Sequence, residues 1–351
     1  MKLSTKPAFW LAFLLLTIPA ACCSAQDAFP TNMMGPADLR NQRPYQLIFL
    51  AFSPEAATVL DNGQSKTSLQ FDLADDLLIP KVTNGVTVHE QTETQRLALS
   101  DRRGLGNGLE ASIDIPVIAR DGGIMDKLIA NYHDLIGDTH TTPDDAIGRD
   151  HVTPYHSDVY FTRPNGADVV DLQSTAGLGD TQLTLKKSLW ASGSTAAAIR
   201  AGLKLPTGSA SKVLGSGAVD GGLDLDLQAS LSSRWALFGN GSYVWMGKDD
   251  TFDGYAQRHM AHGAFAIEYY ASTHTSWVLQ NDLGQAGVKT GNNFADGAQG
   301  TVSLAYKFAT PSNTLWTYAF SENGGVVADR ASWVANVGPD PTFSVGWARY
   351  Y

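Results

Sequence analysis

The sequence predicts an all-β fold: an antiparallel up-and-down transmembrane β-barrel of about 12 strands (range about 10–14), with one short amphipathic helix in a long loop. Three observations predict it. Glycine is abundant, with 34 residues, while only 17% of residues are charged and 10% are aromatic. Apolar and polar residues alternate along many short segments, and short and long connections alternate between those segments. A barrel strand is apolar on one face only, so a membrane barrel needs no continuous hydrophobic run.

The alternation has a period of two residues, which is the period of a β-strand. From Leu223 to Leu231, leucine and alanine occupy every second position, and Asp224 and Asp226 lie between them. The charges on the second face indicate an interior lined with polar groups. The predicted strands are 67–75, 86–99, 108–119, 179–190, 194–206, 222–231, 234–246, 259–271, 274–283, 299–308, 314–320 and 342–351.

Connection lengths distinguish a barrel from a β-sandwich, which also alternates. Over the carboxy-terminal half, short and long links strictly alternate, as in barrels with short periplasmic turns and long external loops. Greek-key links of a sandwich have no reason to alternate in this way. The short links are 191–194, 232–233, 272–273 and 309–313, and the long ones are 207–222, 247–258, 284–298 and 322–341.

The amino-terminus predicts export. Lys2 and Lys6 precede the apolar run Ala8–Ile18, which is too short to span a bilayer, and small residues follow. We expect residues 1–25 to be a signal peptide, cleaved before Gln26. The alternative, a lipoprotein acylated on Cys22, fits less well because Pro19 stands where such signals usually carry leucine.

Composition excludes several classes of protein. Both cysteines lie in the predicted signal peptide, so the mature chain has no disulfide and no cysteine-based zinc site. Without Lys2 and Lys6, 23 basic residues face 35 acidic ones, which argues against nucleic-acid binding driven by charge. No later apolar run reaches 18 residues, which excludes transmembrane helices. We expect no cofactor and no metal, because His133, His140, His151 and His156 lack a tight ligand spacing.

The remaining chain divides into an amino-terminal periplasmic or lumen segment, 26–66, and the barrel, 67–351, with a long insertion at 120–178. Tyr45–Phe52 is strand-like but apolar on both faces, so it is either an inner segment or part of a further strand pair. Apolar residues recur at helical spacing over 124–136, which predicts a short amphipathic helix. The helix could cover the mouth, enter the lumen or lie on the membrane. Asp126, His133 and Arg149 are candidates for a latch that holds it, with a structural anchor favoured over a latch at the pore.

The candidate functional residues are charged side chains on the polar strand faces. Two interpretations are open: mutual neutralisation inside a filled barrel, or a polarised pore that orients a solute. These lumen-lining candidates are Lys186, Arg200, Lys204, Asp224, Asp226, Glu268 and Lys307.

Aromatic residues predict the membrane boundaries. Trp235 and Trp245 share one strand face ten residues apart, which corresponds to about 25 Å along the membrane normal at a tilt near 40°. That distance matches the apolar band between two aromatic girdles. The predicted girdle residues are Trp235, Tyr243, Trp245, Trp277, Trp316 and Trp347.

The last predicted strand resembles the closing strand of bacterial outer-membrane barrels, because its apolar face ends on an aromatic residue. The resemblance implies that Phe343, Val345, Trp347 and Tyr351 form a signal read by the barrel-assembly machinery. It also implies periplasmic chaperones and outer-membrane lipids as partners.

Several short motifs are spread along the chain. They are Leu39–Pro44, Glu93–Arg96, Asp126–Ile129 with His133, Gly137 and Arg149, Gly177–Asp180, and Leu205–Ser209 before Gly215, Gly217 and Asp220. In these motifs the chain resembles a proteobacterial family of predicted outer-membrane barrels, domain of unknown function 3187. The resemblance implies a location in the outer membrane of a Gram-negative bacterium. The last two motifs also look like those of transporters for aromatic-compound catabolism.

These observations predict a non-enzymatic pore or transporter for small solutes, with a hydrophobic or aromatic cargo suggested by the transporter likeness. The main alternative is a closed structural or adhesive barrel that binds an external partner. An outer-membrane lipid hydrolase is a third and more distant alternative. His156, Ser157 and His262 would be its residues, but no Gly-x-Ser-x-Gly elbow accompanies them.

Overall fold

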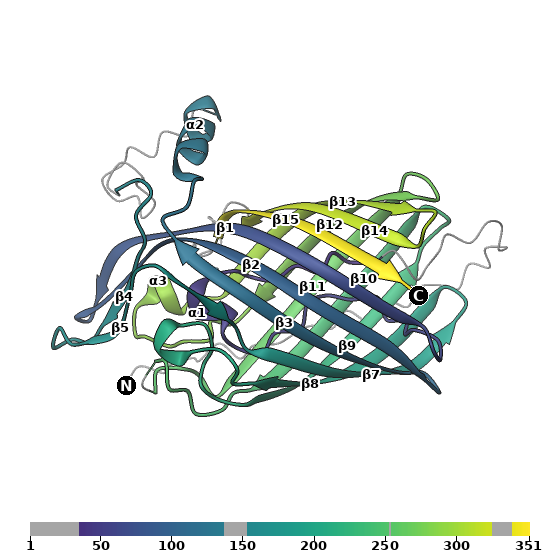
Figure 1. Cartoon of the computed structure of the whole chain (residues 1–351), viewed down its shortest axis with the longest axis horizontal. Helices are drawn as coiled ribbons and strands as arrows, with labels where there is room; N and C mark the ends of the chain where they lie inside the picture. Colours follow the sequence, from purple (N-terminus) through teal and green to yellow (C-terminus); the bar gives the residue numbers. More distant parts are fainter. Residues whose placement is uncertain (1–34, 137–152, 253, 325–338) are drawn as a thin grey trace, which may run out of the picture.

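The protein is a barrel of antiparallel strands, described here from a computed structural model over residues 35–136, 153–252, 254–324 and 339–351 (Figure 1). The predicted signal peptide and Arg149 lie outside these residues. Twelve strands of the described chain form the wall. They are β1 (Ser65–Thr83), β2 (Val86–Gly106), β3 (Leu109–Asp121), β7 (Thr181–Ser192), β8 (Thr195–Leu205), β9 (Asp220–Ser230), β10 (Trp235–Trp245), β11 (His259–Tyr270), β12 (Thr275–Gly284), β13 (Gln299–Thr310), β14 (Thr314–Asn323) and β15 (Pro339–Tyr350).

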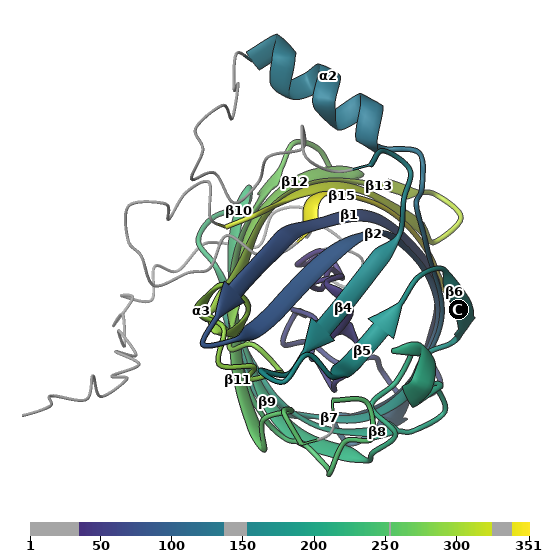
Figure 2. The ribbon, with the colours of Figure 1, turned by 90° about the vertical axis from the view of Figure 1, so that its left-hand side faces the viewer.

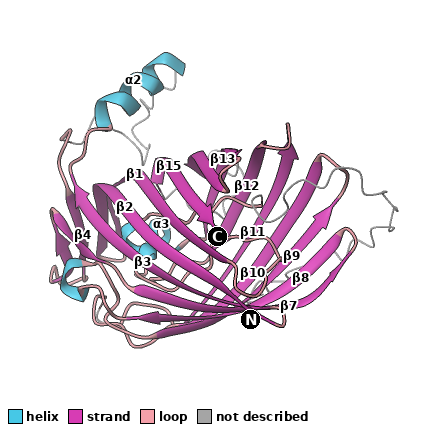
Figure 3. Cartoon of the chain, turned by 45° about the vertical axis from the view of Figure 1, so that its right-hand side comes forward, coloured by secondary structure: helices cyan, strands magenta, loops and turns pink. Residues whose placement is uncertain are grey.

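The wall is closed, because its first and last strands pair with each other. β1 lies antiparallel to β15, with Leu69 opposite Trp347, and each of the other wall strands pairs with the next one along the chain. β3 pairs with β7 and so bridges the long insertion. Figure 3 shows the resulting tilted strands. The prediction of a closed up-and-down transmembrane barrel of twelve strands is therefore confirmed.

Alternating side chains give the wall an apolar outer face and a polar inner face. On β9, Leu223 is 43% exposed on the outside, whereas Asp224 and Asp226 are buried on the inside. β10 pairs with β9 in the register that places Tyr243 beside Leu223, so the outer faces of neighbouring strands coincide. Large apolar side chains exposed around a closed barrel form the surface that lipid covers.

The two ends of the barrel differ. The short links 193–194, 231–234, 271–274 and 311–313 lie at one end, which we call the short-turn end. The links 206–219, 246–258 and 285–298 lie at the other, the long-loop end. No helix of the described residues is long and apolar enough to cross a membrane.

β1 and β2 are longer than the predicted strands 67–75 and 86–99, because their hairpin continues beyond the long-loop end of the wall. An Asn-Gly turn joins them, with positive φ at Asn84 and Gly85, as a tight hairpin requires. The start of β2 then pairs with β4 (Asp158–Thr162), which pairs with β5 (Asp168–Leu172). The short β6 (Thr175–Leu178) pairs with β3.

This extension crosses the mouth of the barrel, as the end-on view shows (Figure 2). Its apolar side chains pack on residues from inside the barrel and from the long loops, and together they form one buried cluster, which we call the mouth cluster. It comprises Tyr45, Ile48, Phe49, Leu50, Phe52, Leu78, Val86, Val88, Val159, Phe161, Val170, Leu172, Val213, Val244, Met246, Phe252, Met260, Val288 and Ala295.

Residues 35–60, which we call the lumen segment, lie inside the barrel. The segment rises from the short-turn end to α1 (Pro44–Leu47) beneath the mouth and returns to β1. Pro44 occupies the first turn of α1, where its missing N–H leaves no hydrogen bond unmade. Of the two possibilities left open for Tyr45–Phe52, the structure shows the inner segment. These residues are apolar on both faces because wall and mouth cluster surround them.

Two glycines of the wall receive the Phe52 ring of the lumen segment. Gly202 of β8 lies opposite Gly222 of β9, and a Cβ atom on either would come within 3 Å of that ring. Larger side chains at these inward positions would leave no room for Phe52.

The substitution Gly202→Val is therefore expected to loosen the lumen segment, at a cost of about 1–3 kcal/mol for overpacking. Limited proteolysis of the purified barrel should show faster cleavage within residues 35–60. The matched control is Gly241→Val on β10, where a Cβ atom meets nothing within 4 Å. Equal cleavage rates in the two variants would contradict the role given to this glycine pair.

The amphipathic helix forms, as α2 (Asp126–Ile136), but it lies outside the barrel (Figures 1 and 2). Glu93 fixes its start, since its carboxylate accepts hydrogen bonds from the backbone N–H groups of Ile124 and Met125. Of the three positions left open for this helix, the structure shows neither the one in the lumen nor the one across the mouth. Helical periodicity gives the apolar face of a helix but not its position, and the lumen is already occupied by residues 35–60.

Candidate functional site

The candidate site is the interior of the barrel, where charged wall residues meet the lumen segment. At its centre, the carboxylate of Glu55 in the lumen segment forms ion pairs with three cationic side chains of the wall. Its carboxylate lies 2.5 Å from Arg102 of β2, 2.9 Å from Arg200 of β8 and 3.2 Å from Lys186 of β7. Strand alternation places all three side chains on the inner face of the wall. The positive charges of the wall therefore lie next to the carboxylate of the lumen segment.

Two aspartates complete this group, which we call the Glu55 cluster. Arg200 donates to Asp224 at 2.7 Å and to Asp226 at 2.9 Å, and Lys186 lies 3.7 Å from Asp226. Lys186, Arg200 and Asp224 are direct cross-strand neighbours in the wall register. Buried charges are tolerated when each is paired and hydrogen-bonded. This cluster meets that condition except at Oδ2 of Asp226, which lies 3.7 Å from Lys186 and accepts no hydrogen bond from the described residues.

The wall cations also bind the backbone of the lumen segment. Arg200 donates to the carbonyl of Ser53 at 2.9 Å, and Lys186 donates to that of Ala56 at 2.5 Å. On the opposite side, Lys307 of β13 donates to the carbonyls of Gly35 and Pro36. The segment is not part of the sheet, so its carbonyls need donors from elsewhere. These cationic side chains therefore supply the hydrogen bonds that a neighbouring strand would otherwise donate to the segment.

Near the mouth, Arg43 holds α1 to the wall. Its guanidinium forms a bidentate pair with Glu90 of β2, with Nε 2.9 Å from Oε2, and also donates to the carbonyl of Ala295. The backbone N–H of Leu50 donates to Asp220 of β9 at 3.0 Å. Polar contacts therefore fix the lumen segment from Gly35 to its turn beneath the mouth cluster.

A second network lies on β1, β2 and β3. Arg96 binds Asp72 at 3.2 Å and Asp114 at 3.1 Å, and Asp72 also accepts a hydrogen bond from Gln42 of the lumen segment. The sequence analysis missed Arg96 and Asp72 as lumen candidates. They lie on the inward face of predicted strands, so the same alternation that indicated Lys186 would have found them.

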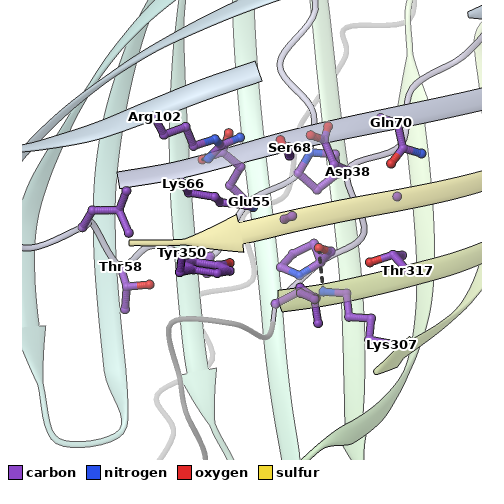
Figure 4. A pocket seen from close by; sticks show the side chains of 18 of the residues that line it. Asp38, Glu55, Thr58, Lys66, Ser68, Gln70, Arg102, Lys307, Thr317 and Tyr350 are labelled. Atoms are coloured by element: carbon purple, nitrogen blue, oxygen red, sulfur yellow. Dashed lines mark hydrogen bonds and ion pairs between the residues drawn. The ribbon is translucent and has the colours of Figure 1, made fainter. Parts of the chain in front are cut away.

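A cavity remains between the lumen segment and the wall towards the short-turn end (Figure 4). Its volume is about 120 Å³. The wall side is formed mainly by β1, β14 and β15, with one charged residue each from β2, β3, β7 and β13, and the segment contributes its two ends. The labelled side chains in Figure 4 include Asp38, Glu55, Lys66, Arg102, Lys307 and Tyr350.

Comparison with known proteins gives the family. The model of the family described as "protein of unknown function (DUF3187)" matches residues 13–329, which is most of the chain. The chain belongs to this family. No curated protein matches it.

Among solved structures, this DUF3187 chain is similar to the COG4313 outer membrane channel from Pseudomonas putida F1. The identity is 12%, the TM-score is 0.55, and the match covers 86% of this chain and 100% of the other. This likeness supports the barrel fold. The chain also matches the NanC porin (7% identity, TM-score 0.43, 81% and 98% covered) and the Ralstonia pickettii toluene transporter TbuX (8%, 0.40, 83% and 90%).

All seven lumen-lining candidates of the DUF3187 chain are buried on inward strand positions, but they divide into separate groups. Lys204 pairs with Asp180 at 2.5 Å and donates to the carbonyl of Ala218 at 2.9 Å, so it braces the 206–219 loop. Glu268 accepts from Ser276 at 2.6 Å. Lys307 binds the start of the lumen segment, as described above. The Glu55 cluster contains the remaining four candidates, Lys186, Arg200, Asp224 and Asp226. Glu55 itself lies outside any strand, where no periodicity could indicate it.

The other predicted site residues lie apart from the Glu55 cluster. Asp126, at the start of α2, accepts a hydrogen bond from the backbone of Tyr155 at 2.5 Å. His133 is in α2 outside the barrel, and Arg149 lies outside the described residues, so the latch of Asp126, His133 and Arg149 stays a prediction. Ser157 shares a hydrogen bond with Thr92, whereas His262 lies on β11 with Nε2 3.7 Å from Asp282, so the two are not brought together.

The girdle residues lie on outward strand faces. Near the short-turn end, Trp235, Tyr269, Trp277 and Tyr306 occupy successive strands in direct register. Tyr243 and Trp245 lie towards the other end of β10, with ring centroids 5.1 Å apart. Of the predicted assembly signal, the outward side chains of Phe343 and Val345 and the terminal Tyr351 are exposed, and Trp347 is half-buried. Their role in assembly stays a prediction.

Glu55 gives the site a pH dependence. Burial alone would raise the pKa of its carboxyl group, but the positive charges of Arg102, Arg200 and Lys186 outweigh burial and hold the pKa well below its usual range. A carboxyl group whose pKa is depressed by folding stabilises the folded state above its unfolded pKa of about 4.3. That contribution is lost as the pH falls through the folded pKa.

The substitution Glu55→Gln is therefore expected to destabilise the lumen segment at neutral pH. Removing one partner of an isolated buried pair costs roughly 3–5 kcal/mol, and less is expected here because Arg200 keeps both aspartates. Thermal unfolding should show a difference from wild type that is constant from pH 8 to about 5 and shrinks below about pH 4. Glu55→Asp, which keeps the charge, is the control. A difference independent of pH would exclude the charge as the cause.

Proposed function

We propose that this protein is a channel for small solutes in the outer membrane of a Gram-negative bacterium, closed in this state by its own lumen segment. The observation that carries the proposal is the way in which the segment is held. Its polar contacts in the lumen include hydrogen bonds and ion pairs to charged wall residues. Its apolar contacts lie in the mouth cluster, at Phe52, and in a second buried cluster where Ala37 and Leu39 pack on wall side chains such as Phe238.

The barrel wall stays folded when the lumen segment moves out of the interior, because its charged side chains keep partners within the wall. Arg200 keeps Asp224 and Asp226 as partners, Lys186 keeps Asp226, and Arg96 keeps Asp72 and Asp114. Water can hydrate the remaining donors, so an emptied lumen is an aqueous passage rather than a collapsed core. A barrel of about twelve strands is intermediate between side-chain-filled barrels and open porins, so its opening depends on what occupies the interior.

The solute that we propose is small and has an apolar or aromatic part. A molecule that enters from the long-loop end meets aromatic rings of the mouth cluster before it reaches the charged interior. Phe161 of β4 and Tyr255 of the 246–258 link lie there in edge-to-face contact, and neither belongs to the lumen segment. Aromatic side chains supply apolar contact area with a defined geometry, and they suit such solutes.

One observation favours the alternative, a closed structural or adhesive barrel. The mouth is covered by β4, β5 and the β1–β2 hairpin, and the lumen beneath it is filled. Planar-bilayer recording of the protein without most of its lumen segment separates the two functions. Conduction by the deleted form supports a channel, whereas a folded barrel that never conducts supports the structural role.

A further inference from the structure

The cavity between the lumen segment and the β1–β15 seam is large enough for a solute. An ordered water needs about 10–15 Å³ measured in the same way, so a cavity of about 120 Å³ holds roughly ten non-hydrogen atoms. That is the size of a single substituted ring. The cavity lies inside the wall near the short-turn end, between the wall and the lumen segment in its bound position (Figure 4).

The charges around this cavity do not cancel. Its lining contains four cations and three carboxylates, although the chain as a whole is acidic. Arg102 pairs with Glu55 and Glu110, Lys186 pairs with Glu55, and Lys307 binds carbonyls of the lumen segment. The cationic excess is therefore local and amounts to one charge.

Of these four cations, Lys66 of β1 is the one that has neither an ion pair nor a hydrogen bond to another of the described residues. Its ammonium group lies 5.5 Å from the centre of the Tyr350 ring. Among the described residues, no carboxylate lies within ion-pair distance of it. A half-buried ammonium group that faces a cavity without a counter-ion favours the entry of an anion.

The anion must carry only one charge and must have an apolar body. Asp38 is exposed to the cavity, and its carboxylate repels a second negative charge there. Pro54, Leu315 and Ala348 contribute apolar atoms to the lining. Such surfaces bind an apolar group by removing it from water.

We propose that this cavity binds a small monocarboxylate with an aromatic or short aliphatic body, its carboxylate on Lys66 and its body against Tyr350 and the apolar lining. The inference rests on the proposed function, and it names the chemical class of the solute.

The test measures equilibrium binding to the full-length folded barrel in detergent by titration calorimetry. The probes are benzoate, the neutral benzamide and the cationic benzylamine. We expect saturable binding of benzoate, at least about tenfold weaker binding of benzamide, and no binding of benzylamine. Lys66→Gln should weaken benzoate binding by about tenfold or more, and Lys66→Arg should retain it. Lys289→Gln removes the same charge from an exposed loop at the other end and is the matched control.

Several results would overturn the inference. They are equal binding of benzoate and benzamide, a preference for benzylamine, unchanged benzoate binding by Lys66→Gln, or no benzoate binding by a protein whose heat-modifiable electrophoretic mobility shows that it is folded. The proposed function is tested separately, because conductance does not depend on this ligand. A protein that conducts without its lumen segment but never binds benzoate is a channel for another solute. A protein that binds benzoate but never conducts is a binding barrel.

Discussion

Deleting residues 36–59 is expected to convert a barrel with no resolved conductance into one that conducts ions in steady single-channel steps. These residues fill the lumen and form the inner part of the mouth cluster, so their removal opens the interior and withdraws support from β4 and β5. The wall should survive, because its twelve strands pair with one another and not with the segment. The measurement is planar-bilayer recording of the purified protein, with heat-modifiable mobility as evidence of folding.

The matched control is deletion of 126–136, which removes α2. This helix lies outside the wall, so its loss should leave the conductance of the full-length barrel unchanged. Conductance that appears on removal of α2 would mean that the helix closes the pore in a state other than this one. A folded barrel that lacks 36–59 and stays silent would be evidence against a channel.

The double substitution of Trp347 and Tyr351 by aspartate is expected to abolish assembly of the barrel in cells. Trp347 lies opposite Leu69 and Trp316 in the seam where β15 joins β1 and β14. At the membrane boundary each carboxylate costs at most about 1 kcal/mol, which is too little to unfold a closed barrel. Complete loss of the protein from outer-membrane fractions would therefore reflect a failure of recognition during assembly.

The control for this experiment is the pair Trp235→Asp and Tyr269→Asp. These rings are 4.7 Å apart on β10 and β11 and meet the same boundary, but they do not lie in the last strand. Membranes should contain this variant at close to normal levels. Equal loss of both double variants would show that lipid exposure, and not the identity of the last strand, is responsible.

The wall could be predicted from the sequence because strand alternation is a local signal. The leucines and aspartates of 223–231 give the inner and outer faces of β9 without any knowledge of its neighbours. Short and long links then give the antiparallel order. This is why Lys186, Arg200 and Asp224 could be assigned to neighbouring strands before their contacts were known.

The lumen segment could not be predicted to the same depth, because its structure is determined by its surroundings. Tyr45–Phe52 is apolar on both faces, a pattern shared by a buried strand and by a segment enclosed on all sides. Glu55 has no periodic pattern around it, and its three partners come from strands far apart in sequence. Likewise, the pattern of 124–136 predicts the helix α2 but carries no information on which side of the wall it lies.

The lumen segment is covalently continuous with the wall, since residues 61–64 alone separate it from β1. A released segment therefore cannot diffuse away, and its effective concentration at its own binding site is in the millimolar range, as for other short flexible tethers. Rebinding is then a first-order event, independent of how much protein the membrane contains. Even modest individual contacts keep such a tethered blocker bound for most of the time. A variant with one weakened contact should thus flicker between closed and conducting states, and only loss of the tethered segment itself should leave the pore permanently open.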